Sequence, residues 1–261
     1  MKFYPKKSLG QNFLVDDKII NSIIEQGNIN NNDVIIEVGP GTGSLTQKIL
    51  EKKPKKFIVI EKDINLANSL NQKYGNKIQV INEDILKFTH EDFLKENAII
   101  FGNLPYNISS QILVKFIKFK KWPPRYLDLI FMFQKELGDK IMGIYKSSNY
   151  SRLSILTSFR LNIVNKFLVS PNCFKPKPKI NSIVIHFKPK KNNLIDVVNI
   201  SKIEKVTNIF FSNKRKMINK NLRKILTDKE INMINGLNIK SRPSELSPEM
   251  YYKIAELSKK V

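Results

Sequence analysis

The pattern that most constrains the fold is a strand, a glycine turn and a helix followed by a second strand, over residues 34 to 61. Residues 34 to 38 (VIIEV) form a nearly continuous β-branched run, which is typical of a strand buried on both faces of a parallel sheet. Three glycines follow within residues 39 to 43, and apolar residues then recur at helical spacing until Pro54. A second apolar run ends in Glu61. This order predicts a βαβ unit of an α/β sheet.

Polar side chains follow the ends of four expected strands. Glu61 lies 22 residues after Gly39, Asp84 follows a third strand at residues 78 to 81, and Asn103 follows a fourth at residues 97 to 101. The carboxyl ends of parallel strands form the edge where open α/β sheets bind ligands, and an acid in the place of Glu61 can accept hydrogen bonds from a ribose diol. The chain lacks the Gly-Lys-Ser/Thr of a triphosphate loop. The acids therefore favour a cofactor with a ribose and an adenine that is not strongly anionic.

The stretch FGNLPYN, residues 101 to 107, combines groups that can hold a flat ring bearing an amino group. Asn103 offers a carbonyl acceptor, Pro105 fixes the backbone, and Tyr106 offers an aromatic face. The alternative is an ordinary turn between a strand and a helix, because Asn, Pro and Gly are common in turns.

Further along the chain, the periodicity predicts more strands and helices. Helices are expected from Asp16 or Asp17, from Ser44, from Ser109, around residues 137 to 145 and at 152 to 161, and strands at 126 to 133, 164 to 169 and 180 to 187. The lysines of the Ser109 helix, including Lys115, predict a solvated face. Residues 1 to 14 are expected to form a basic, mostly irregular segment. In the loop of residues 170 to 179, stiffened by three prolines and edged with lysines, Phe174 has little reason to belong to the core.

Residues 188 to 193 have the composition of a linker, which predicts a division into domains 1–187 and 188–261. The second part shows helical periodicity and holds 17 basic and 7 acidic residues. We therefore expect an α/β domain with helices on both faces of its sheet, and a small, basic, all-α C-terminal domain.

The formal net charge of +22 favours a polyanionic partner, either nucleic acid or an anionic membrane face, although part of the lysine excess also fits a general composition bias. The single cysteine, Cys173, excludes an internal disulfide framework. His90 and His186 are far apart in sequence and are expected to be ordinary loop and strand residues, so no metal site is predicted. No apolar stretch approaches about 18 residues, and the N-terminus lacks the apolar core of a secretory signal. A soluble, cytoplasmic protein is expected.

Taken together, these motifs resemble those of S-adenosylmethionine-dependent adenine-N6 methyltransferases, and most closely the ribosomal small-subunit RNA (16S rRNA) adenine dimethyltransferases of the KsgA type. The resemblance covers nearly the whole chain: LGQNFL at residues 9 to 14, EVGPGTG at 37 to 43, residues 101 to 109, residues 174 to 182 and the basic helical tail. DNA and protein methyltransferases with a related loop usually carry Pro where Leu104 stands, so the loop is more similar to that of the RNA enzymes.

The resemblance implies a Rossmann-like methyltransferase sheet, a C-terminal domain at residues 188–261 that binds RNA and the ribosome, and a role for nine residues. Asn12 and Leu14 would lie over S-adenosylmethionine, Gly39 would lie behind its methionine part, Glu61 would hold the ribose and Asp84 would meet the adenine. Catalysis would involve Asn103, Leu104, Tyr106 and Phe174, and Asn103 would also contact the cofactor.

The reaction implied by the resemblance is methylation of the N6 amines of two adjacent adenosines near the 3′ end of small-subunit rRNA. An adenine amine is a poor nucleophile because its lone pair is delocalised into the ring. If the Asn103 side chain and the Leu104 carbonyl accept its two N–H groups, the lone pair is aimed at the methyl group, and positioning supplies most of the rate. The target base has to leave its stack, and Tyr106 and Phe174 are the candidates for holding it. The expected partner is the pre-30S particle, and the enzyme is expected to be a monomer.

Two alternatives are open. A large-subunit (23S) rRNA adenine methyltransferase of the antibiotic-resistance (Erm) type shares the fold and the chemistry, although residues 213 to 223 and 242 to 246 are more similar to the small-subunit family. A non-catalytic RNA-binding assembly factor could retain the fold, but the complete set of acids and the intact Asn-Leu-Pro-Tyr sequence speak against it.

Overall fold

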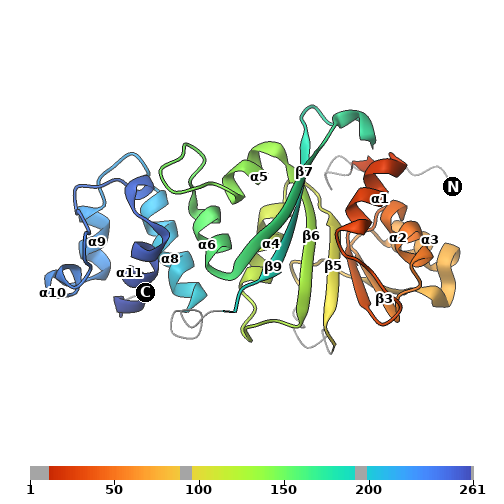
Figure 1. Ribbon diagram of the computed structural model, residues 1–261, viewed down its shortest axis with the longest axis horizontal. Coiled ribbons are helices and arrows are strands. Elements are labelled where there is room, and N and C mark those ends of the chain that lie inside the picture. Colours follow the sequence, from red (N-terminus) through yellow and green to blue (C-terminus); the bar gives the residue numbers. More distant parts are fainter. Residues whose placement is uncertain (1–11, 89–95, 192–198, 260–261) are drawn as a thin grey trace. The chain divides into compact units, whose positions relative to one another are not determined.

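The computed structural model describes residues 12–88, 96–191 and 199–259 and divides the chain into two compact units (Figure 1). The first comprises Met1–Phe116, Pro124–Gly138 and Ile163–Pro189, and the second Ile117–Pro123, Asp139–Asn162 and Lys190–Val261. Leu9, Gly10, Gln11 and His90, which entered the sequence predictions, lie outside the described residues.

A seven-stranded sheet organises the first unit, with strand order β4-β3-β2-β5-β6-β9-β7. Neighbouring strands from β4 to β6 pair in parallel, and β9 runs antiparallel to β6. The strands are β2 (Val34–Val38), β3 (Lys56–Glu61), β4 (Gln79–Asn82), β5 (Ala98–Asn103), β6 (Tyr126–Gln134), β7 (Leu161–Val169) and β9 (Ser182–Pro189). All five residues of β2 are buried, as expected for a central parallel strand.

Helices cover both faces of this sheet. They are α1 (Asp17–Glu25), α2 (Ser44–Glu51), α3 (Ile64–Tyr74), which continues into the 3₁₀ turn η2 (Gly75–Lys77), α4 (Ser109–Ile117) and α5 (Lys135–Ile141). Successive side chains of β6 point to opposite faces. Ile130 and Met132 join a core cluster with the apolar side of α1 and α2, whereas Phe131 packs against Phe116 of α4 with ring centroids 5.5 Å apart. The predicted α/β fold with helices on both faces is confirmed.

A second, two-stranded sheet was not predicted. β1 (Phe13–Leu14) pairs antiparallel with β8 (Phe174–Lys175), and the 3₁₀ turn η4 (Pro171–Cys173) precedes β8. The amide of Val15 extends the pairing by donating to the carbonyl of Cys173 over 2.8 Å. The expectation of an irregular segment before Asp16 is therefore wrong for β1, because two-residue strands carry no periodicity that a sequence pattern can show.

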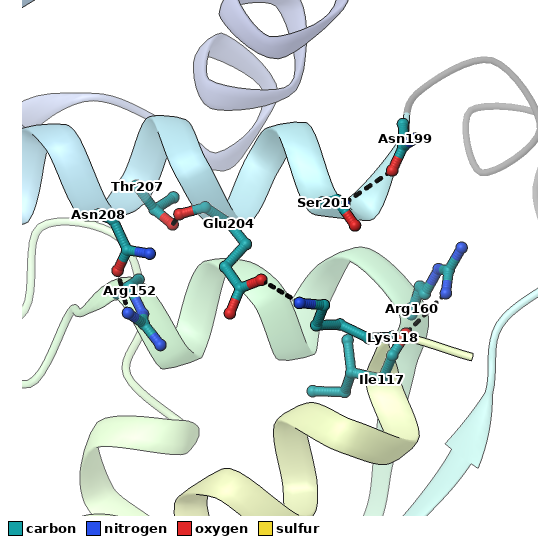
Figure 2. Close-up of polar contacts among 9 residues, drawn as sticks. All are labelled: Ile117, Lys118, Arg152, Arg160, Asn199, Ser201, Glu204, Thr207 and Asn208. Atoms are coloured by element: carbon teal, nitrogen blue, oxygen red, sulfur yellow. Dashed lines mark hydrogen bonds and ion pairs between the residues drawn. The ribbon is translucent and has the colours of Figure 1, made fainter. Parts of the chain in front are cut away.

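The second unit is built from helices, including the expected C-terminal ones. Its elements are α6 (Arg152–Arg160), α8 (Ile200–Phe211), α9 (Asn219–Ile225), α10 (Asp228–Asn232), η5 (Pro243–Glu245) and α11 (Pro248–Leu257). Figure 2 shows how α8 is tied to its neighbours: Glu204 forms an ion pair with Lys118, and Asn208 accepts a hydrogen bond from Arg152. Asn199 caps α8 by accepting from the amide of Ser201 over 2.8 Å.

Arg160, at the end of α6, holds the segment of residues 117 to 123 within the second unit. Its guanidinium donates to the carbonyls of Ile117 and Phe119, each over 2.7 Å, and lies 4.3 Å from the ring centroid of Trp122. Residues 117–123 and 139–162 thus group with the C-terminal helices. The predicted functional boundary after residue 187 stays a prediction.

Candidate active site

The carboxyl ends of β2, β3 and β5 and the turn after β4 border an open cleft in the first unit. Its empty volume is about 1100 Å³, adjoining solvent included. Eight predicted site residues line it: Asn12, Leu14, Gly39, Glu61, Asp84, Asn103, Leu104 and Tyr106. Phe174 is not among the described residues that line the cleft. The structure therefore brings together the residues that the strand ends and the first segment supply.

At the glycine turn the cleft is lined by backbone atoms that carry no side chain, those of Gly39 and Gly41. Gly39 and Gly41 have φ angles of +68° and +58°, a backbone conformation that residues other than glycine rarely adopt. A Cβ atom on Gly41 would lie 3.0 Å from the ring of Phe13, which covers the turn from β1. A ligand can therefore approach the turn closely at Gly39, where the nearest atom to an added Cβ is 3.9 Å away on Pro105.

Glu61 ends β3 as a buried carboxylate fixed by backbone donors. Its Oε2 atom accepts from the amide of Gly41 over 3.1 Å, and Oε1 accepts from the amide of Asp63 over 2.8 Å. Burial raises the pKa of the Glu61 carboxyl, and the backbone amides of Asp63, Gly41 and Lys62 oppose this only in part. A carboxylate has about four acceptor positions, so Glu61 can still accept from a hydroxyl donor in the cleft. This arrangement fits the diol for which Glu61 was predicted.

Asp84 is held by a turn and by a lysine. Its Oδ1 atom accepts from the amide of Leu86 over 2.9 Å, and Oδ2 forms a 2.9 Å ion pair with Lys62. Burial acts to raise the pKa of Asp84, but the hydrogen bonds from Lys62 and Leu86 outweigh it, and the pKa is lowered. Asp84 therefore presents a charged carboxylate, the form that accepts hydrogen bonds from an amine.

Lys115 of α4 was predicted to lie on a solvated face, and this is wrong. Its ammonium donates to the carbonyl of Leu86 over 3.3 Å and to that of Phe88. The side chain thus fixes the turn that carries Asp84. A lysine on the polar side of a helix gives no sign of such a contact, because the partner is a backbone carbonyl 27 or more residues away.

Asn103 is oriented by the chain segment that leads into β1. Its Nδ2 atom donates to the carbonyl of Asn12 over 3.1 Å, which leaves the side-chain carbonyl as the group that can accept from a ligand. The neighbouring Leu104 side chain is buried, and a Cβ atom on Gly102 would lie 2.5 Å from it. Close packing therefore fixes the backbone on both sides of Asn103.

Tyr106 lines the cleft and is bonded to β9. Its hydroxyl lies 2.5 Å from Oγ of the buried Ser182. Burial raises the pKa of Tyr106, so the phenol is neutral at physiological pH. The fixed hydroxyl holds the aromatic ring at the cleft without providing a base.

Phe174 belongs to the core, contrary to the prediction. The ring is only 2% exposed and lies in the same apolar cluster as Leu14, its partner in the register of β1 and β8. Pairing of β8 with β1 turns this side chain inward while Lys175 faces solvent. The prolines and lysines of the loop did not indicate a strand that pairs with residues about 160 positions earlier. A catalytic role for Phe174 stays a prediction.

Glu37 also lines the cleft, but the sequence motifs gave it no role. Its side chain is 1% exposed at the end of β2, and Oε2 accepts a 2.7 Å hydrogen bond from the hydroxyl of Thr46 in α2. Burial raises the pKa of the carboxyl to about 8, with a smaller contribution from the charge of Glu61. Glu37 thus binds a proton near neutral pH.

The Glu37 proton predicts a pH dependence of stability. The folded chain keeps this proton up to about pH 8, whereas the carboxyl's ordinary pKa is 4.5. Between these values folding takes up a proton, so the free energy of unfolding falls as pH rises, by at most about 1.4 kcal/mol per pH unit. Glu37→Gln, which can still accept from Thr46, should remove this contribution. Urea unfolding of both proteins from pH 5 to 8 measures the difference, and parallel pH profiles would contradict a raised pKa.

The buried residue His186 does not line the cleft among the described residues. It lies on β9 and is bonded to Asp128 on β6, in agreement with the expectation that it is an ordinary strand residue. Within residues 12–88, 96–191 and 199–259, no group of three or more His, Cys, Asp or Glu side chains is placed to hold a metal ion. In the same ranges no helix is both long and apolar enough to cross a membrane.

Similar proteins agree with these features. "Ribosomal RNA small subunit methyltransferase A" of Pelagibacter ubique (strain HTCC1062) is 42% identical over 252 residues, 96% of this chain and 95% of the relative. The protein of the same name from Rhizobium etli (strain CIAT 652) is 35% identical over 254 residues, 96% of this chain and 91% of the relative.

Solved structures show the same fold. A dimethyladenosine transferase from Plasmodium falciparum superposes with a TM-score of 0.76 at 25% identity, covering 93% of this chain and 95% of that one. The 23S rRNA methyltransferase ErmE, at 22% identity and a TM-score of 0.64 over 95% of this chain and all of its own, shows a shared fold alone.

The family that the sequence motifs predicted is confirmed over almost the entire length. The family model described as ribosomal RNA adenine dimethylase matches residues 2–260. The chain therefore belongs to the ribosomal RNA adenine dimethylase family.

Proposed function

We propose that this protein transfers methyl groups from S-adenosylmethionine to the N6 amines of two adjacent adenosines near the 3′ end of small-subunit rRNA. The observation that carries the proposal is the orientation of Asn103. Its Nδ2 atom donates to the Asn12 carbonyl, which leaves the side-chain carbonyl to accept from a ligand in the cleft that Asn103, Glu61 and Asp84 line.

The cleft residues fit S-adenosylmethionine by their donor and acceptor chemistry. Glu61 would accept from the ribose hydroxyls, Asp84 from the adenine amine, and the bare backbone at Gly39 would allow close approach of the methionine part. Asn12 and Leu14 would cover the ligand. When bound, S-adenosylmethionine supplies an electrophilic methyl group on a positively charged sulfur.

Positioning by the chain accounts for catalysis without a side-chain base. The Asn103 carbonyl and the Leu104 carbonyl accept the two N–H groups of the target amine, which directs the nitrogen lone pair. Tyr106, held at Ser182, offers its ring for stacking on the flipped base, which contributes roughly 1 to 3 kcal/mol per base. For Phe174 to reach the base, its ring would have to leave the apolar cluster.

The names of the relatives favour the small-subunit substrate over the large-subunit alternative, and the intact cleft favours an enzyme over a non-catalytic factor. The net charge of +22 supports RNA as the partner. We accordingly propose the pre-30S particle as substrate, a monomeric enzyme and a cytoplasmic location.

A labelled-methyl assay tests the proposal. The full chain is incubated with labelled S-adenosylmethionine and undermethylated small subunits, with large subunits in parallel, and the modified bases are mapped. We expect label on two adjacent adenosines of the small subunit alone. Label on large-subunit RNA would identify the first alternative, and RNA binding without label would identify the second.

A further inference from the structure

The segment from Lys175 to Ile180 lies between two positions that contact residues lining the cleft. At its start, Lys175 pairs with Phe13 in the register of β8 and β1, and Phe13 lines the cleft. Two residues beyond its end, Oγ of Ser182 lies 2.5 Å from the hydroxyl of Tyr106, another residue that lines the cleft. The segment thus runs between two wall residues of the cleft, and its position follows from contacts within the first unit.

Three lysines alternate with two prolines along this segment. Lys175, Lys177 and Lys179, here termed the rim lysines, are exposed, and Pro176 and Pro178 stand between them. Within the described part of the chain no ion pair or hydrogen bond engages their ammonium groups. Proline restricts the backbone, so the three charges are held on a stiffened segment instead of a floppy loop. The pairing of β8 with β1 and the hydrogen bond from the amide of Lys135 to the carbonyl of Asn181 restrain the two ends of the segment further.

These features fit a nucleic-acid backbone. A base that enters the cleft has to be turned out of its stack, which brings the phosphates on either side of that nucleotide to the rim. Lysine is a compact point charge that neutralises phosphate without demanding a fixed geometry. A row of unpaired cations beside the entrance is therefore suited to the flanking backbone, whatever its base sequence.

We propose that the rim lysines Lys175, Lys177 and Lys179 bind the RNA phosphates that flank the target adenosine. The proposal rests on the proposed function, because it takes the cleft to be the place where the base enters. It assigns to the segment after Phe174 a task in substrate binding, separate from the cofactor and from the transfer step.

The test uses the triple variant Lys175→Gln/Lys177→Gln/Lys179→Gln, in which the three positive charges are removed. Its affinity for a single-stranded, adenosine-containing RNA is measured at several salt concentrations. Each phosphate contact contributes about −0.7 to the slope of log affinity against log salt for single strands, so three contacts predict a slope less negative by about 2. With undermethylated small subunits, KM should rise on the order of tenfold while kcat at saturation is unchanged. Affinity for S-adenosylhomocysteine should stay at the wild-type value.

The chain offers a matched control at the other edge of the sheet. Lys52, Lys53 and Lys56 are exposed and lie in the turn that enters β3 at its amino end, away from the cleft at the carboxyl ends. The triple replacement of these lysines by Gln changes the net charge equally. We expect it to change the salt slope by far less than the rim variant does.

Equal salt slopes for the rim variant and the control would overturn the proposal, because the effect would then be one of net charge. If the triple rim variant does not fold, Lys177→Gln alone should change the slope by about 0.7. The binding measurement is independent of turnover. A wild-type chain that methylates no small subunits would refute the proposed function, and the salt slopes would still decide whether the rim lysines bind RNA.

Discussion

Asn103→Ala should lower the rate of methyl transfer by roughly 100- to 1000-fold, the range seen when a single oriented hydrogen-bonding group is removed from an active site. The variant lacks the side-chain carbonyl, which the bond from Nδ2 to Asn12 leaves to accept from the target amine. Affinity for S-adenosylmethionine should fall only slightly, because Glu61 and Asp84 stay in place. Single-turnover transfer and calorimetric binding separate the two quantities.

Asn71→Ala is the control for this variant. Asn71 lies exposed on α3, so the same chemical change there should leave both transfer and binding as in the wild type. An Asn103→Ala enzyme that keeps most of its activity would refute the assigned role. A parallel loss of cofactor affinity would instead make Asn103 mainly a ligand of S-adenosylmethionine.

Phe174→Ala should reduce the free energy of unfolding by about 3 to 5 kcal/mol, the usual cost of removing a buried aromatic ring. The ring is 2% exposed in a cluster with Leu14 and Cys173, and its loss would leave a cavity under the β1–β8 pair. Because β1 carries two wall residues of the cleft, affinity for S-adenosylhomocysteine should fall as well. Chemical denaturation and calorimetry measure these effects.

Phe174→Leu separates packing from catalysis. An apolar replacement of similar bulk usually costs less than about 1.5 kcal/mol, so this variant should fold and bind cofactor nearly as the wild type does. If it also turns over normally, Phe174 acts by supporting β1. Stable protein with lost turnover would instead mean that the ring reaches the target base, as the family resemblance implies. A loss below 1 kcal/mol in the Ala variant would contradict its place in the core.

The sequence predicted those parts of the fold and site in which a single strand, turn or helix has a recognisable residue pattern. The β-branched run of β2 and the glycine turn indicated the sheet, and the spacing from Gly39 to Glu61 placed an acid at the correct edge. Asp84 and Asn103 followed from the ends of the next strands. The carboxyl ends of parallel strands lie at the same edge of a sheet, so a polar residue that follows a strand in sequence can be placed at that edge from the local pattern alone.

The roles of other residues depend on contacts with residues far away in the chain. For these the sequence pattern gave no indication or a wrong one. Phe174 became a core residue through pairing with β1, and Lys115 became a support of the Asp84 turn through backbone carbonyls. Glu37 is part of a buried strand, as the pattern indicated, but it also lines the cleft, which the pattern did not indicate. A sequence pattern reports the preference of a residue, whereas these roles depend on what the fold places beside it.

The hydrogen bond between Asn103 and Asn12 has a consequence for base discrimination. An amide side chain normally offers both a donor and an acceptor and so tolerates either kind of partner. Here one N–H of the Asn103 amide donates to the Asn12 carbonyl, which orients the side chain and leaves its carbonyl oxygen to accept from a base. A base with a carbonyl at the reacting position, such as hypoxanthine in place of adenine, would bring oxygen against oxygen. We therefore expect such a base to bind less well than adenine before the methyl-transfer step.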